Sequence, residues 1–192
     1  MAARSNAAVE SPERVLIITR IFDAPRELLF EAVTDPKHLM SWWGPDGCTV
    51  ISCEVDPRVG GTWCISMRSS RALPQFAHRY PTETGPGPSQ SSEAGAHVAA
   101  GDHSWIVERQ RGVYQEVVKP ERLVFTYAFE DDAGRALHQT VVTLTFADEG
   151  SQTKLTLHQA IFESVSARDD HVRGWTEALQ HLVEHLSRAR PR

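Results

Sequence analysis

The sequence predicts a single α+β domain in which a curved, seven-stranded antiparallel sheet surrounds one long C-terminal helix, with two short helices after the first strand. Near the C-terminus, apolar residues recur at the three-and-four spacing of one helical face: Val172, Trp175, Leu179, Leu182, Val183 and Leu186. The regular stretches upstream alternate mostly with the period of two that is typical of strands. A single amphipathic helix must bury its apolar face, and a sheet that curves around it provides the cover.

The composition is that of a globular protein with one domain. The chain has 192 residues, of which 41% are hydrophobic. The net charge is −5 and the Lys and Arg residues are scattered, so we expect no nucleic-acid partner. No apolar run reaches membrane-spanning length, and residues 1–12 lack the order of a signal peptide. We therefore expect a cytoplasmic protein without a membrane partner, of an oligomeric state that the sequence does not indicate.

The N-terminal part predicts a leader, a strand and two short helices. Residues 1–13 are rich in Ala and Ser without a period, which predicts a disordered leader. A β-branched apolar run at 15–22 predicts the first strand. Proline in the first turn favours helices at 25–33 and 36–43, and Asp35 can cap the second.

The remaining strands occupy 50–55, 62–67, 106–118, 122–129, 138–146 and 154–162. The first two form a hairpin around a glycine-rich turn, and short polar connections join the last four in a meander. The final helix covers 164–186. We expect one domain at 14–187, followed by a tail at 188–192.

Several short motifs occur in a fixed order. They are residues 19–25 (TRIFDAP), 34–36 (TDP) with 42–45 (WWGP), 53–56 (CEVD) with 60–61 (GG), 112–114 (GVY), 120–125 (PERLVF) and 174–175 (GW). In this order they resemble the helix-grip, or START-like (SRPBCC), superfamily, and within it the branch homologous to the activator of heat-shock protein 90 ATPase. The resemblance implies a curved sheet that grips the last helix over an internal cavity, often for an apolar ligand.

One segment departs from that family pattern. Residues 69–104 contain almost no Leu, Ile or Val but many Pro, Gly, Ser and Ala, which predicts a flexible insertion in a hairpin turn. The resemblance places this turn where the cavity opens. Leu73, Phe76 and Tyr80 could fold over the opening as a lid, and a passive disordered loop is the alternative.

Strand and helix phase identify the candidate cavity residues. The alternation around Phe125 and Tyr127 predicts an inward aromatic face, while Trp43 could line the cavity mouth or close the core. Tyr114, His158 and Gln159 are polar groups that could face the cavity. The full set of predicted ligand-binding residues is Arg20, Trp43, Ile65, Met67, Tyr114, Phe125, Tyr127, Gln159 and Trp175.

Arg20 shares its phase with the apolar residues of the first strand, which predicts an inward-facing charge. Such a charge is costly unless it is paired. It could anchor a carboxylate or phenolate of a ligand. Alternatively, it pairs with a residue such as Glu54 or Glu116, or it lies at a strand edge.

The remaining sequence patterns give little support for a metal-binding, disulfide or catalytic role. His181 and His185 match the H-x-x-E-H zinc-protease pattern, but helical phase places Glu184 opposite the core, and no third ligand is evident. We interpret these residues as the solvated side of the helix. Cys53 and Cys64 flank the glycine turn, and a regular hairpin would place them opposite one another, close enough for a disulfide. A register with one bulge would separate the thiols, and unbonded cysteines are then expected. No catalytic motif, metal site or cofactor loop emerges.

Three functions therefore remain open. The first is non-enzymatic binding of a small, mostly apolar molecule between the sheet and the C-terminal helix. The second, which the resemblance implies, is a protein-interaction module that acts on a chaperone in a stress response. The third is a cyclase- or hydratase-like enzyme, which the lack of an evident acid/base pair disfavours.

Overall fold

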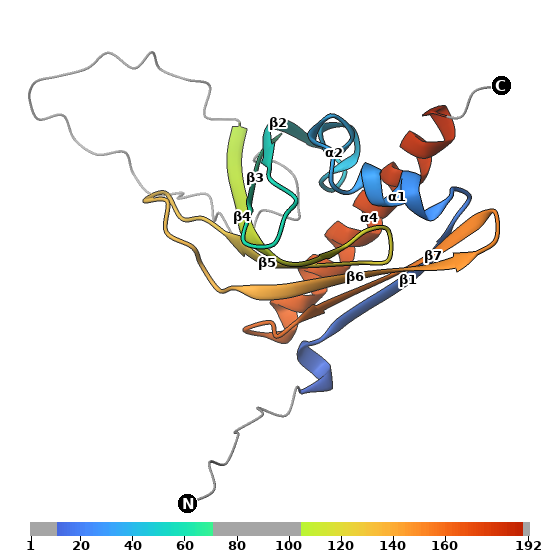
Figure 1. The fold of residues 1–192 in the computed structure, drawn as a ribbon. Coiled ribbons are helices and arrows are strands. Elements are labelled where there is room, and N and C mark those ends of the chain that lie inside the picture. Colours follow the sequence, from blue (N-terminus) through green and yellow to red (C-terminus); the bar gives the residue numbers. More distant parts are fainter. Residues whose placement is uncertain (1–10, 71–104, 190–192) are drawn as a thin grey trace, which may run out of the picture.

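The computed structural model describes residues 11–70 and 105–189. The elements, in chain order, are η1 (Pro12–Arg14), β1 (Leu16–Phe22), α1 (Arg26–Ala32), α2 (Pro36–Trp42), β2 (Cys48–Val55), β3 (Thr62–Ser70), β4 (Trp105–Val118), β5 (Arg122–Phe129), β6 (Thr140–Glu149), β7 (Gln152–Ala160) and α4 (Val165–Ala189). Figure 1 shows the sheet curling around α4, with α1 and α2 beside the C-terminal half of that helix.

The seven strands form one sheet in the order β1-β7-β6-β5-β4-β3-β2, and all neighbours are antiparallel. Strands β2 to β7 pair in sequence order as a meander. The first strand crosses over to pair with β7, so β1 and β2 are the two edges. This architecture confirms the predicted α+β helix-grip fold.

Local chemistry explains the helices. The Asp35 carboxylate accepts a hydrogen bond from Lys37 N at 2.7 Å and caps α2, and Pro36 occupies its first position. Most of the predicted apolar stripe of α4 is buried, with Trp175, Leu179, Leu182 and Leu186 at most 6% exposed. Each large apolar side chain buried in this way contributes roughly 1.5–3 kcal/mol to folding.

Several boundaries differ from the sequence-based expectation. Pro12–Arg14 form a 3-10 turn where a disordered leader was predicted. Strand β3 continues through Ser70, because Ser69 and Ser70 pair with β4, so the predicted insertion begins too early. The predicted insertion beyond Ser70 lies outside the described residues, as do Leu73, Phe76, Tyr80 and the lid prediction.

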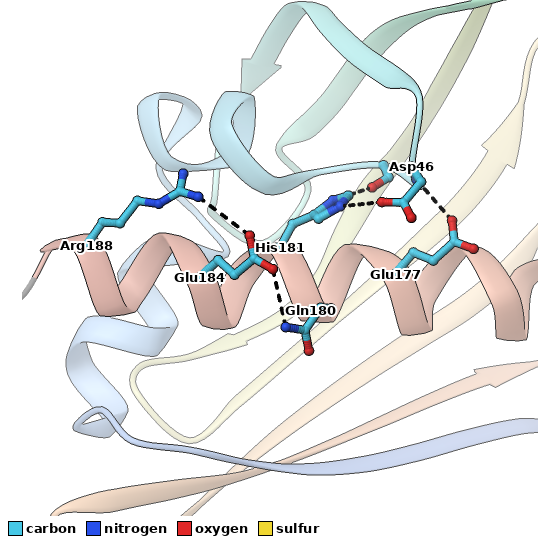
Figure 2. Close-up of polar contacts among 7 residues, drawn as sticks. Asp46, Glu177, Gln180, His181, Glu184 and Arg188 are labelled. Atoms are coloured by element: carbon cyan, nitrogen blue, oxygen red, sulfur yellow. Dashed lines mark hydrogen bonds and ion pairs between the residues drawn. The ribbon is translucent and has the colours of Figure 1, made fainter.

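The last two strands and the final helix are also shifted. The β6–β7 hairpin closes tightly at Gly150, whose φ of 80° suits a two-residue turn, so β6 extends to Glu149. Helix α4 continues to Ala189, beyond the predicted end. An exposed Glu184–Arg188 pair, with a nitrogen–oxygen distance of 3.6 Å, spans this last part of the helix (Figure 2).

Candidate ligand cavity

A cavity of about 80 Å³ lies between the N-terminal half of α4, the inner faces of β3, β4 and β5, and the loop after α2. Its lining is Trp43, Gly44, Pro45, Met67, Glu108, Gln110, Tyr127, Phe129, Asp170, His171, Arg173, Gly174, Trp175 and Ala178. The strands therefore supply a rigid, hydrogen-bonded wall, whereas the wall formed by Trp43, Gly44 and Pro45 is a loop.

Aromatic rings form the apolar part of the wall. Trp43 and Trp175 meet in a T-shaped arrangement with ring centroids 5.2 Å apart, and Tyr127 lies 6.4 Å from Trp175. His171 contacts Tyr127 and Phe129 edge-on at 5.5 and 5.7 Å. These separations are typical of favourable aromatic packing, so the rings hold one another in place.

A second, smaller cavity of about 20 Å³ lies deeper in the core. Its lining is almost entirely apolar and includes Ile65, Tyr114 and Phe125 from the predicted set. Trp43 and Trp175 line both cavities and so stand between them. By its apolar lining and small volume, this cavity is of the kind that holds no ordered water.

Two glutamine side chains fix the tryptophan rings. Trp43 Nε1 donates to Gln110 Oε1 at 2.8 Å, and Trp175 Nε1 donates to Gln159 Oε1 at 2.7 Å. Gln159 is fully buried and its amide nitrogen donates to Thr140 Oγ1 at 2.8 Å. Buried polar groups that are satisfied in this way rigidify a core.

The other end of the cavity is polar. Glu108 on β4 is only 4% exposed, and Asp170, His171 and Arg173 come from α4. Arg173 pairs with Asp170 at 2.8 Å. His171 Nδ1 lies 2.8 Å from the carbonyl oxygen of Ala167. Because a carbonyl oxygen can only accept, this nitrogen carries a proton.

The loop at the cavity wall is fastened to α4 (Figure 2). His181 Nδ1 lies 3.1 Å from Gly44 O, and Nε2 lies 2.8 Å from Asp46 Oδ1. The backbone N–H of Asp46 donates to Glu177 Oε2 at 3.0 Å. The ring of His181 and the carboxylate of Glu177 thus join α4 to the loop at two positions, Gly44 and Asp46.

The structure brings together only part of the predicted set. Trp43, Met67, Tyr127 and Trp175 line the main cavity, whereas Ile65, Tyr114 and Phe125 line the smaller one. Gln159 supports Trp175 from behind. Trp43 lines both cavities, and the predicted inward phase of β5 is confirmed for Phe125 and Tyr127, because each lines one of the cavities.

Arg20 and His158 lie outside both cavities. Arg20 faces inward, but on the edge strand β1, where its guanidinium donates to Gln180 on α4. Of the alternatives considered for Arg20, its position matches the one at a strand edge. It does not pair with Glu116, because that carboxylate pairs with Arg122 at 3.1 Å. His158 precedes the buried Gln159 and so points to the opposite, outer face of β7.

Sequence reasoning missed the polar end of the cavity. Glu108 and Gln110 alternate with exposed residues on β4, in the same phase as the buried Tyr114, and this period of two was a usable signal. Glu108, Asp170 and His171 also supply carboxyl and imidazole groups at one site. The lack of an evident acid/base pair therefore no longer argues against an enzyme.

The two histidines of the H-x-x-E-H pattern contact separate partners. His185 Nε2 lies 2.7 Å from His38 Nδ1 on α2, whereas His181 contacts the loop at Asp46. The predicted solvated face is thus partly covered by α2, because that helix packs against α4. Within residues 11–70 and 105–189, no group of three His, Cys, Asp or Glu side chains is arranged to hold a metal ion.

The cysteines are free thiols. The register pairs Cys53 with Ile65 and Glu54 with Cys64, so the two cysteines are not opposite one another. The irregularity in this pairing lies between Val50 and Ser52, farther from the turn than Cys53, so it does not cause the offset. Burial raises the pKa of Cys48 to about 12 and that of Cys53 to about 11. Because only the thiolate is a good nucleophile, neither cysteine is activated.

Comparison with known proteins identifies relatives of this fold. A crystal structure described as an AHSA1 protein from Silicibacter pomeroyi shares 22% identity and a TM-score of 0.68, covering 92% of this chain and 99% of that chain. A crystal structure of a protein from Chromobacterium violaceum shares 22% identity and a TM-score of 0.62, and the match covers 89% of this chain and 96% of that chain. A solution structure from Staphylococcus epidermidis shares 17% identity and a TM-score of 0.65, covering 96% of each chain.

At these identities the solved structures show the fold alone. No curated protein matches the chain. In the described part of the chain, no helix has the length and apolar character needed to cross a membrane. A family model described as Activator of Hsp90 ATPase homolog 1-like protein matches residues 23–79 and 88–187. Because this match covers most of the sequence, the chain belongs to the Activator of Hsp90 ATPase homolog 1-like family, within the helix-grip (SRPBCC) superfamily.

Proposed function

We propose that this protein binds a small, mostly apolar molecule in the cavity between α4 and the sheet. The observation that carries the proposal is the cavity's composition: ring faces of Trp43, Tyr127 and Trp175 on one side and a few convergent polar groups at the other end. Small-molecule sites combine an apolar lining with a few fixed polar groups in this way.

The size of the cavity limits the ligand. Typical ligand pockets measure roughly 300–1,000 Å³, whereas this one measures about 80 Å³. The ligand is therefore close to a single substituted ring in size, or one wall moves to admit a larger molecule. The loop at Gly44 to Gly47 is the wall suited to move, because side-chain contacts to α4 fasten it rather than a strand ladder.

Gly174 offers a sharp test of the site. It lies on α4 in the cavity wall, and a Cβ atom built there meets no atom of the described residues within 4 Å. Gly174→Leu should fill the cavity and weaken binding of single-ring compounds at least tenfold, while Gly174→Ala serves as the matched control and should bind almost as the parent does. Native mass spectrometry against a panel of such compounds gives the affinities. Equal binding by the Leu variant and the parent would place the ligand elsewhere.

A second candidate is a chaperone-directed interaction in the cytoplasm with a role in stress response. The observation that favours it is the family description, which names a homologue of an Hsp90 ATPase activator. Stimulation of Hsp90 ATPase by the purified protein is the test, together with co-purification of the two. No stimulation and no complex at micromolar concentrations would remove this candidate and leave ligand binding unaffected.

A further inference from the structure

We propose that the cavity selects a neutral ligand that carries a hydrogen-bond acceptor, such as a carbonyl oxygen, and that Gln110 Nε2 donates to this acceptor. The inference rests on the proposed ligand binding and adds the chemical class of the ligand. It follows from the orientation of one buried amide. Gln110 is 3% exposed, lies on the inner face of β4 and lines the cavity.

The orientation of the Gln110 amide is determined by Trp43. An indole N–H can only donate, so the amide oxygen of Gln110 must be the atom that faces Trp43 Nε1 at 2.8 Å. The amide nitrogen, which carries two hydrogens, then points the other way. Among the described residues, the acceptor within its reach is Met67 Sδ at 3.9 Å.

A thioether sulfur is a weak acceptor, so the Gln110 amide keeps donor capacity that the protein itself uses poorly. Gln159 provides an internal comparison. It also accepts from a tryptophan, but its amide nitrogen donates to Thr140 Oγ1 at 2.8 Å and lines neither cavity. Gln159 is therefore structural, whereas Gln110 presents a buried donor to the cavity.

The surrounding charges favour a neutral ligand over an anion. Glu108 lies two residues from Gln110 on the same face of β4 and also lines the cavity, at 4% exposure. Arg173, the Arg or Lys among the described lining residues, already pairs with Asp170 at 2.8 Å. Arg20, the expected anchor for an acidic ligand, lies outside the cavity. A ligand carboxylate beside Gln110 would therefore lie close to a second buried carboxyl group, and the guanidinium among the described lining residues is already paired.

Three probes of similar shape test this selection: acetophenone, in which a ketone oxygen is the acceptor; α-methylstyrene, in which a methylene group replaces that oxygen; and benzoate, which is an anion. Quenching of tryptophan fluorescence reports binding, because Trp43 and Trp175 line the cavity. We expect acetophenone to bind about tenfold more tightly than α-methylstyrene, as one well-placed hydrogen bond allows. Benzoate should bind more weakly than acetophenone.

Variants assign the selectivity to Gln110. Gln110→Leu should lose the preference for the ketone and still bind the hydrocarbon. Trp43→Phe, which removes the indole N–H that orients the amide, should reduce the preference without abolishing hydrocarbon binding. Melting temperatures of both variants serve as controls for folding, and Gln110→Met replaces Leu if that variant is unstable.

The outcomes separate the two levels of the proposal. If neither the ketone nor the hydrocarbon binds, the proposed cavity function fails, and this inference fails with it. If both bind the parent equally, or if Gln110→Leu keeps the ketone preference, the assignment of Gln110 is overturned while ligand binding stands. Tighter binding of benzoate than of acetophenone would overturn the selection for a neutral ligand.

Discussion

The hydrogen bond between Trp175 and Gln159 is the contact on which the junction of α4 with the sheet most depends. Trp175 is 6% exposed and Gln159 is 0% exposed, and the indole N–H donates to the amide oxygen at 2.7 Å. Trp175→Phe keeps an aromatic ring but removes the only donor of that ring. The amide oxygen of Gln159 is then buried without this partner.

Two contributions determine how much Trp175→Phe lowers the free energy of unfolding. A buried acceptor that loses its partner costs about 1–3 kcal/mol. The smaller ring loses about 1 kcal/mol of apolar burial, on the scale of about 25 cal/mol per Å². We therefore expect Trp175→Phe to lower the free energy of unfolding by about 2–4 kcal/mol, a large part of the roughly 5–15 kcal/mol of a typical domain.

A double-mutant cycle isolates the hydrogen bond. Gln159→Met removes the amide, and the hydroxyl of Thr140 then still donates to Tyr127 O at 3.3 Å. The double variant, with Phe at 175 and Met at 159, should be about 1–3 kcal/mol more stable than the sum of the two single losses predicts. Urea denaturation followed by far-UV circular dichroism measures this without relying on the altered chromophore. Additive losses, or a cost below about 0.5 kcal/mol for Trp175→Phe, would refute the reasoning.

Three further predictions concern α4 and the loop beside it. Gly174→Ala should raise the free energy of unfolding by about 0.5–1 kcal/mol, because it removes a helix-interior glycine where a Cβ atom meets no described atom within 4 Å; a loss in urea denaturation would contradict this. His181→Ala should leave global stability within about 1 kcal/mol, since its contacts are partly exposed, but it should speed hydrogen exchange at residues 44–48, and unchanged exchange would show that His181 does not fasten the loop. The pKa of His185 is lowered by burial and then by His38, so the unfolded state binds this proton more readily and stability should fall as the pH drops below about 6.5. His185→Leu should flatten that loss in melting temperatures measured from pH 7.5 to 5, and an unchanged acid slope would assign it to other groups.

The sequence was sufficient where periodicity alone decides the structure. The stripe of α4 predicted most of the side chains that this helix buries, because a helix has one period along its whole length. The alternation of β5 predicted that Phe125 and Tyr127 face the cavities, but not that the other face of the strand is buried too. The sequence did not predict side-chain partners where two elements that are distant in the chain meet. The phase of Arg20 was correct, but its surroundings depend on β1 being an edge strand, which follows from the pairing of β1 with β7. Similarly, the partner of His185 comes from α2, a helix whose packing on α4 has no signature in the local sequence.

The position of the cavity follows from the sizes of the side chains along α4. The C-terminal half of the helix presents Leu179, Leu182 and Leu186, which are buried and fill the space under the sheet. Before Leu179, the inward face of the helix includes the small residues Gly174 and Ala178, and both line the cavity. Interiors are otherwise packed to the density of organic crystals, so two small residues on the inward face leave a void that the sheet cannot close. The void persists because Trp43 and Trp175 are each fixed by a glutamine, which prevents their rings from collapsing into it.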